Sequence, residues 1–173
     1  MQVDSALDQV WQLLESLTDP EIPVVTLREL GILRDVRYVV AHDGAEQLEV
    51  VITPTYSGCP AMGQIEDDVH NLLQAHGIKG KVKTQLAPAW TTDWMSDSAK
   101  EKLRAYGIAP PNCQSTSTSQ VVRFTRRLQD DVVACPLCGS TNTTITSAFG
   151  STACKALCKC LNCQEPFDYF KPY

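Results

Sequence analysis

Apolar side chains recur every three or four residues near the start of the chain, at Leu7, Val10, Trp11, Leu14 and Leu17. This spacing predicts an amphipathic helix whose apolar stripe faces a core. Asp4 stands where a helix N-cap is expected, and the two prolines of TDPEIP end the pattern.

Two runs rich in β-branched residues come next, GILRDVRYVV at 31–40 and QLEVVIT at 47–53. The pair Asp43 and Gly44 lies between them and is a strong hairpin signal. We therefore expect two antiparallel neighbouring strands.

A second helical pattern, QIEDDVHNLLQAHG, places Ile65, Val69, Leu72 and Leu73 on one face and stops at Gly77. The segment KVKTQLA then reads as a third strand. Because a helix joins the second strand to the third, the two can run parallel. The pattern predicts an α+β fold that starts with a small α/β two-layer sandwich and a mixed three-stranded sheet.

The remainder of the chain predicts a short helix, a linker and a small second domain. Ser96 and Gly107 bound the helical segment DSAKEKLRAY, and the following IAPPNCQSTSTSQ has the composition of a linker. We therefore predict a first domain at residues 1–108, a linker at 109–130 and a second domain at 131–173.

Composition and charge narrow the classes of function. The 173 residues are 43% hydrophobic and carry a formal charge of -5, with one short basic cluster at Arg123–Arg127. An acidic chain lacks the basic face that binding to phosphates requires, which argues against a nucleic-acid reader. The first residues carry no Lys or Arg, and no apolar run approaches the roughly 18 residues of a membrane span. We expect a cytoplasmic protein with no membrane partner.

Six of the eight cysteines lie between Cys135 and Cys163. In a reducing compartment such clusters are metal ligands or reactive thiols more often than disulfides. Two CxxC units, Cys135 with Cys138 and Cys160 with Cys163, are separated by 21 residues, and the residues between them read as a hairpin. This spacing predicts a C-terminal four-cysteine zinc ribbon with a closed structural site, and a redox dithiol is the alternative. Gly139 can take the left-handed conformation that the first turn requires.

The other cysteines and polar groups leave alternatives open. Cys154 and Cys158 suit packing roles, while alternative ligation or an iron-sulfur site stays open for both. Cys59 precedes the second helix, where helix amides stabilise a thiolate, so it is either a reactive or metal-binding thiol or a buried loop residue. Asp19 and Glu21 can cap the following turn or point into a cleft. His42, His70 and His76 suit surface or capping roles, and Trp90 and Trp94 suit packing on the sheet or at the inter-domain seam.

Four segments together resemble the PaaD family, also called PaaJ, small proteins encoded with the phenylacetyl-CoA epoxidase of aerobic phenylacetate catabolism. They are DPEIPVVTLRELGIL, TPTYSGCPAM, PAWTTDWMSDSAKEKLRAYGIAPP and FGSTACKALCKCLNCQEPFDYFK. The first two thirds of the chain is also similar to the wider SufT-like iron-sulfur assembly proteins. The marks of that family are the triplet Asp19–Glu21, the triplet Leu30–Ile32 and the single cysteine of the loop from Thr55 to Pro60.

The resemblance implies an accessory or maturation protein of the epoxidase, not an enzyme. Cys59 corresponds to the single functional cysteine of the family and would ligate an iron-sulfur cluster transiently, completed by a second copy in a homodimer, a carrier or a client. The implied partners are iron-sulfur carriers and the reductase or di-iron oxygenase components of the epoxidase. The zinc ribbon becomes a candidate client-docking surface, and Cys158, where the family usually has an aromatic residue, is not a required ligand. A stoichiometric subunit of the oxygenase and a zinc-ribbon nucleic-acid binder remain as alternatives.

Overall fold

The fold is α+β, as the hydrophobic pattern predicts, and the chain divides into two units at residues 1–99 and 100–173. The computed structural model describes residues 2–40, 44–56, 58–111 and 132–173. Within these ranges every helix is too short or too polar to cross a membrane.

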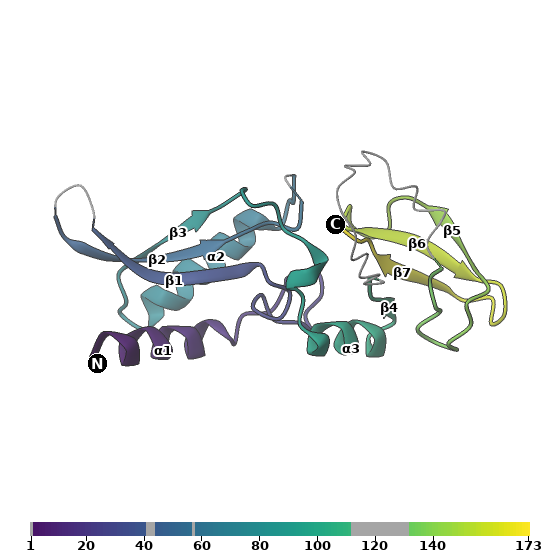
Figure 1. The fold of residues 1–173 in the computed structure, drawn as a ribbon, viewed down its shortest axis with the longest axis horizontal. Helices are drawn as coiled ribbons and strands as arrows, with labels where there is room; N and C mark the ends of the chain where they lie inside the picture. Colours follow the sequence, from purple (N-terminus) through teal and green to yellow (C-terminus); the bar gives the residue numbers. More distant parts are fainter. Residues whose placement is uncertain (1, 41–43, 57, 112–131) are drawn as a thin grey trace, which may run out of the picture. The chain divides into compact units, whose positions relative to one another are not determined.

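The first unit contains a mixed three-stranded sheet with two helices packed on it (Figure 1). Its elements are α1 (Gln2–Leu14), β1 (Leu33–Val40), β2 (Glu46–Ile52), α2 (Met62–Ala75) and β3 (Gly80–Thr84). Strand β1 runs antiparallel to β2, and β3 runs parallel to β2 on its other side. Both the predicted hairpin and the predicted mixed sheet are therefore confirmed.

The last five residues of β2 are all buried, and its apolar side chains form part of the core of this unit. Leu48, Val50 and Ile52 are at most 2% exposed, and Val50 pairs with Val36 of β1 and Val82 of β3. Ile65, Val69 and Leu73 form the buried stripe of α2, and α1 contributes the buried side chains of Val10 and Leu14. Burying each such side chain contributes roughly 2 kcal/mol.

Helix α2 ends at Gly77 in the way the sequence predicts. Gly77 has a φ of +68° and its N–H donates to the carbonyl of Gln74 at 3.0 Å, while the N–H of Ile78 donates to Leu73 at 2.9 Å. This pair of bonds is a Schellman motif, which satisfies two of the last carbonyls of the helix.

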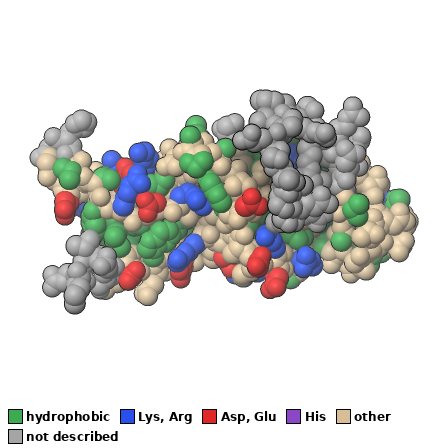
Figure 2. Space-filling view, viewed as in Figure 1, with side chains coloured by type: hydrophobic (Ala, Val, Ile, Leu, Met, Phe, Trp, Pro, Cys, Tyr) green, Lys and Arg blue, Asp and Glu red, His purple; other side chains and the backbone are tan. Residues whose placement is uncertain are grey.

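A buried carboxylate lies on the sheet beside three cations. Glu49 stands opposite Arg37 on one neighbouring strand and Lys81 on the other. Its oxygens lie 2.7 Å from Arg37 Nη2, 3.2 Å from Lys81 Nζ and 3.9 Å from Lys83 Nζ. Acidic and basic side chains likewise lie side by side on the face shown in Figure 2. The cross-strand register thus provides the compensation that a buried charge requires.

The second unit contains a four-stranded sheet in the order β4-β7-β6-β5. Its elements are most of α3 (Asp97–Ala105), β4 (Ile108–Ala109), β5 (Thr143–Ser147), β6 (Lys155–Cys160) and β7 (Pro166–Phe170). The predicted hairpin of β5 and β6 is confirmed, and Ser96 caps α3 by accepting a hydrogen bond from Ala99 N–H at 3.0 Å. The sequence did not indicate β7 or its parallel pairing with β4.

The linker predicted at 109–130 falls mostly outside the described residues, which resume at residue 132. Ala109, its first residue, lies in β4 and is 1% exposed. The predicted domain boundaries at 108 and 131 stay a prediction.

Candidate metal centre and the Cys59 loop

Four cysteine sulfurs of the second unit converge on one point. Cys135 and Cys138 precede β5, Cys160 ends β6, and Cys163 lies in the turn between β6 and β7. All four Sγ atoms lie within 4.8 Å of one another. The structure therefore brings together the four residues that the CxxC spacing singles out.

Both CxxC turns have the same backbone geometry. The N–H of Cys135 donates to the carbonyl of Ser140 at 2.9 Å, and the N–H of Cys160 donates to that of Glu165 at 3.0 Å. The residue after each second cysteine has a left-handed backbone, with φ of +74° at Gly139 and +67° at Gln164. The sequence predicted this conformation at Gly139 but gave no signal at Gln164, because glutamine rarely adopts it.

The sulfur positions fit a tetrahedral ion. A zinc-sulfur bond of about 2.3 Å places tetrahedral sulfurs about 3.8 Å apart. The distance is 3.8 Å between the sulfurs of Cys135 and Cys163, and 3.6 Å between those of Cys138 and Cys160. Four protein ligands close the coordination shell, so such a site stabilises the fold and leaves no position for a substrate.

Backbone N–H groups lower the pKa values of these thiols, whereas burial raises them. A hydrogen bond from the backbone of Cys163, joined by one from Asn162, lowers the pKa of Cys160 to about 6 against the cost of burial. A backbone hydrogen bond from Glu165 favours the Cys163 thiolate, but burial and the three neighbouring cysteines outweigh it and raise the pKa of Cys163 to about 12. A second thiol of the group is harder to ionise because a negatively charged thiolate is already close to it. A bound cation would allow all four cysteines to ionise together.

Cys154 and Cys158 lie outside the four-sulfur group. Cys158 is fully buried in the core beside Ala156, Phe167 and Tyr169, where burial and then the charge of Asp168 raise its pKa to about 11. Cys154 is 6% exposed and its sulfur lies 3.0 Å from Thr152 Oγ1. Both positions agree with the packing role considered for these thiols.

Cys59 lies in the loop between β2 and α2 and is partly buried. Its carbonyl accepts the N–H of Met62, the first residue of α2, at 3.3 Å. Ala61, at the N-cap, provides no side-chain cap, and the first turn carries no acidic residue. The first turn of α2 thus supplies no carboxylate of its own to its free amides. The structure confirms that Cys59 lies near a helix N-terminus.

Thr53 begins the same loop and is 1% exposed. Its N–H donates to the carbonyl of Ile32 at 2.8 Å. Among the described residues, its hydroxyl is the one buried side-chain polar atom without a hydrogen-bond partner. Such a group is unusual in a folded core.

Asp19 acts as a cap in the loop after α1. Its Oδ1 accepts the N–H of Glu21 at 2.9 Å and that of Ile22 at 2.8 Å, and the side chain is 7% exposed. Of the two roles considered for Asp19, the structure thus shows the cap. A contribution of Asp19 or Glu21 to cofactor binding stays a prediction.

Two family descriptions match the chain. Residues 7–85 match the family described as iron-sulfur cluster assembly protein, and residues 121–171 match the PaaD zinc beta ribbon domain. The first range contains Asp19 and Cys59, and the second contains the four clustered cysteines.

The chain is also similar to proteins of known sequence and of known structure. An Escherichia coli (strain K12) protein, named as one component of a "Putative 1,2-phenylacetyl-CoA epoxidase", is 44% identical over 164 residues, which cover 94% of this chain and 91% of the relative. A domain of unknown function from Bacillus anthracis is 28% identical with a TM-score of 0.49, over 58% of this chain and 92% of that one. A conserved hypothetical protein from Thermotoga maritima is 24% identical with a TM-score of 0.43, over 56% and 91%.

Proposed function

Because the chain belongs to the PaaD-like family, which joins an iron-sulfur assembly domain to a zinc ribbon, we propose that it is an accessory protein of a phenylacetyl-CoA epoxidase. In this role it assists the assembly of an iron-sulfur cluster or its insertion into a component of the epoxidase. The role is one of maturation and not of catalysis. The cluster is cargo, and the clients are the reductase or the di-iron oxygenase components.

The position of Cys59 carries the proposal. This thiol is only partly buried, and it precedes a helix whose first amides have no side-chain cap and no nearby acid in the first turn. Those amides favour a thiolate, which is the form that ligates iron. One thiolate per chain holds a cluster weakly, and weak ligation suits transfer to a client. The other ligands come from a second copy, a carrier or the client.

The four-cysteine group has a separate, structural role in this proposal. We assign zinc to it because the sulfur spacing fits a tetrahedral zinc-thiolate site and the domain matches a zinc ribbon. Cys135, Cys138, Cys160 and Cys163 would hold the ion. The ion would supply folding free energy that a domain of this size cannot obtain from its core alone.

The test is to replace Cys59 by Ala in cells that make the epoxidase. We expect a folded variant with an unchanged melting temperature and a client that has lost most of its iron and acid-labile sulfide. Cys154→Ala, which removes a thiol outside both sites, is the matched control and should leave the client fully loaded. Full loading of the client beside Cys59→Ala would refute the maturation role.

The name of the Escherichia coli relative favours a second candidate, a stoichiometric subunit of the epoxidase. Such a component would remain bound to the catalytic components in about equal amounts through size-exclusion chromatography. A maturation factor would separate from the loaded enzyme. The comparison needs only the wild-type proteins.

A further inference from the structure

A pocket of about 410 Å³ opens at the end of α2, far along the helix from Cys59. It lies where the C-terminal half of α2, the start of β2 and the segment leading into β3 meet. Its lining residues are Gln47, His70, Gln74, Gly77, Ile78, Lys79 and Gly80. This volume lies in the range of roughly 300 to 1,000 Å³ that is usual for small-molecule sites.

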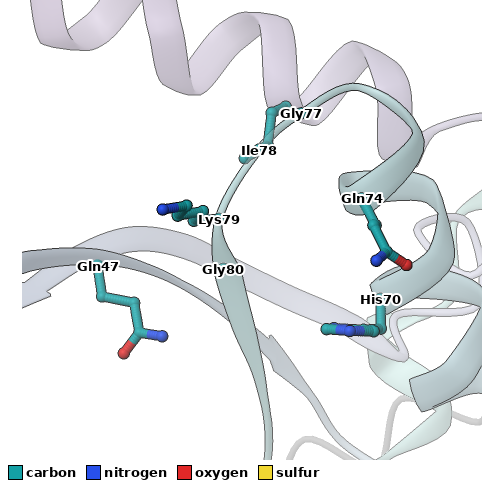
Figure 3. Close-up of a pocket in the computed structure, with 7 residues that line it drawn as sticks. All are labelled: Gln47, His70, Gln74, Gly77, Ile78, Lys79 and Gly80. Atoms are coloured by element: carbon teal, nitrogen blue, oxygen red, sulfur yellow. The ribbon is translucent and has the colours of Figure 1, made fainter.

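The polar side chains of the pocket come from different elements. Figure 3 shows His70 and Gln74 projecting from α2 on one side, with Gln47 of β2 and Lys79 on the other. Within the described part of the chain these four side chains make no hydrogen bond or ion pair. His70, Gln74 and Lys79 are exposed and Gln47 is half-buried, so their hydrogen-bonding groups are open to solvent or to a ligand.

The side chains that line the pocket carry a net positive charge. Lys79 is the one permanently charged side chain among the seven lining residues, and none of the seven is a carboxylate. The two lysines of β3 that follow it, Lys81 and Lys83, differ in having a carboxylate partner, because both lie within ion-pair distance of Glu49. Among these three lysines, Lys79 alone lines the pocket and has no carboxylate partner in the described residues.

Two backbone carbonyls at this end of α2 are already paired within the chain. The Schellman motif pairs the carbonyls of Leu73 and Gln74 with the N–H groups of Ile78 and Gly77. These carbonyls would otherwise favour a cation at the helix end. The lining thus combines an ammonium group, an imidazole and two carboxamides with the apolar side chain of Ile78.

We propose that this pocket binds a small organic oxyanion, a carboxylate or a phosphate. The ammonium group of Lys79 pairs with the charge, while Gln47, His70 and Gln74 donate hydrogen bonds to the oxygens. The apolar part of the ligand lies against Ile78. The proposal does not depend on Cys59 or on the metal centre.

The test is an NMR titration of the full chain at constant ionic strength, once with inorganic phosphate and once with acetate. We expect saturable shifts at the amides of Gly77, Ile78, Lys79 and Gly80. Lys79→Gln should weaken this binding about tenfold, as expected for a lost charge pair in a partly open site. Lys83→Gln, which removes an equal charge nearby on the same segment of chain, should change it less than about twofold.

The anion that saturates at the lower concentration identifies the chemistry, phosphate or carboxylate. The proposal is overturned if neither anion shifts these amides at up to about 10 mM, which corresponds to an affinity too weak for a specific site. Equal weakening by Lys79→Gln and Lys83→Gln would overturn it as well, because the binding would then report only the net charge of the surface.

Discussion

Gly31 lies directly against the backbone of Trp94. A Cβ at position 31 would stand 2.7 Å from Trp94 Cβ and 2.8 Å from its carbonyl oxygen, and Gly31 has a φ of +74°. Next to it, the carbonyl of Leu30 accepts a hydrogen bond from Trp90 Nε1 at 3.0 Å. The triplet Leu30–Ile32 is thus the place where the segment after β3 packs against the earlier part of the first unit.

Gly31→Ala should therefore destabilise the first unit strongly. We expect a loss of about 2 to 4 kcal/mol, because both the backbone conformation and the contact with Trp94 become strained. Gly77→Ala is the matched control, since its φ of +68° is similar but no atom lies within 4 Å of the added Cβ. It should cost only about 1 kcal/mol in urea unfolding. Equal losses in the two variants would show that the contact with Trp94 contributes nothing.

Asp19 allows capping to be separated from a role in cluster binding. Asp19→Ala removes the acceptor of two backbone N–H groups and should lower the free energy of unfolding by about 1 to 2 kcal/mol. Asp19→Asn keeps an oxygen at the same place and should cost much less. If Asp19→Asn is stable yet delivers less iron to the client, the carboxylate charge has a role beyond the cap. Unchanged delivery would limit Asp19 to capping.

Glu49 should make the stability of the first unit depend on pH. Burial by itself would raise the pKa of its carboxyl, but Arg37, Lys81 and Lys83 outweigh burial and lower the pKa below its ordinary value of 4.5. A group whose pKa is lowered on folding contributes its full stabilisation above the unfolded value and loses it as the pH falls through the folded value. The difference in unfolding free energy between wild type and Glu49→Gln should therefore be constant above about pH 5 and shrink below pH 4.5.

At neutral pH we expect Glu49→Gln to cost about 1 kcal/mol, a modest value because its cationic partners are about half exposed. Asp35→Asn is the control, since Asp35 pairs with the same Arg37 at 3.0 Å but is itself 47% exposed. At neutral pH it should change stability by only a few tenths of a kcal/mol. A difference for Glu49→Gln that grows toward acid would contradict the assigned direction of the pKa.

Metal analysis should separate ligands from packing cysteines in the second unit. We expect about one zinc per chain in the wild type and none in Cys138→Ser, which also loses amide protection in β5, β6 and β7. Cys158→Ala should keep the zinc and cost about 1 kcal/mol for the small cavity it leaves in the core. Loss of zinc in Cys158→Ala, or iron with matching sulfide in the wild-type ribbon, would point to a different metal site.

The elements that the sequence predicted are those with local signals. The β-branched runs on either side of Asp43 and Gly44 indicated the hairpin, and the spacing of Ile65, Val69 and Leu73 indicated α2. Both signals lie within a short stretch of chain. Strand β7 was not predicted from the sequence, although it pairs antiparallel with its neighbour β6 over five residues. Its second pairing, with the distant two-residue strand β4, could not be predicted from local sequence. Parallel pairing across such a separation leaves no local signature.

The sites show the same division. Regular CxxC spacing was enough to single out the four clustered cysteines, whereas nothing in the sequence distinguished His70 from the other histidines or joined it to Gln47 and Lys79. Those residues come from separate elements, and only the packing of α2 on the sheet brings them together.

The sequence by itself determined the α+β class, the two metal-binding turns and the position of Cys59 before a helix, because each follows from local spacing and backbone preference. Tertiary structure decided which carboxylate of the sheet is buried among cations, why Gly31 has to be a glycine and which polar residues line one pocket. These features depend on distances between residues far apart in the chain, and such distances exist only once the layers have packed.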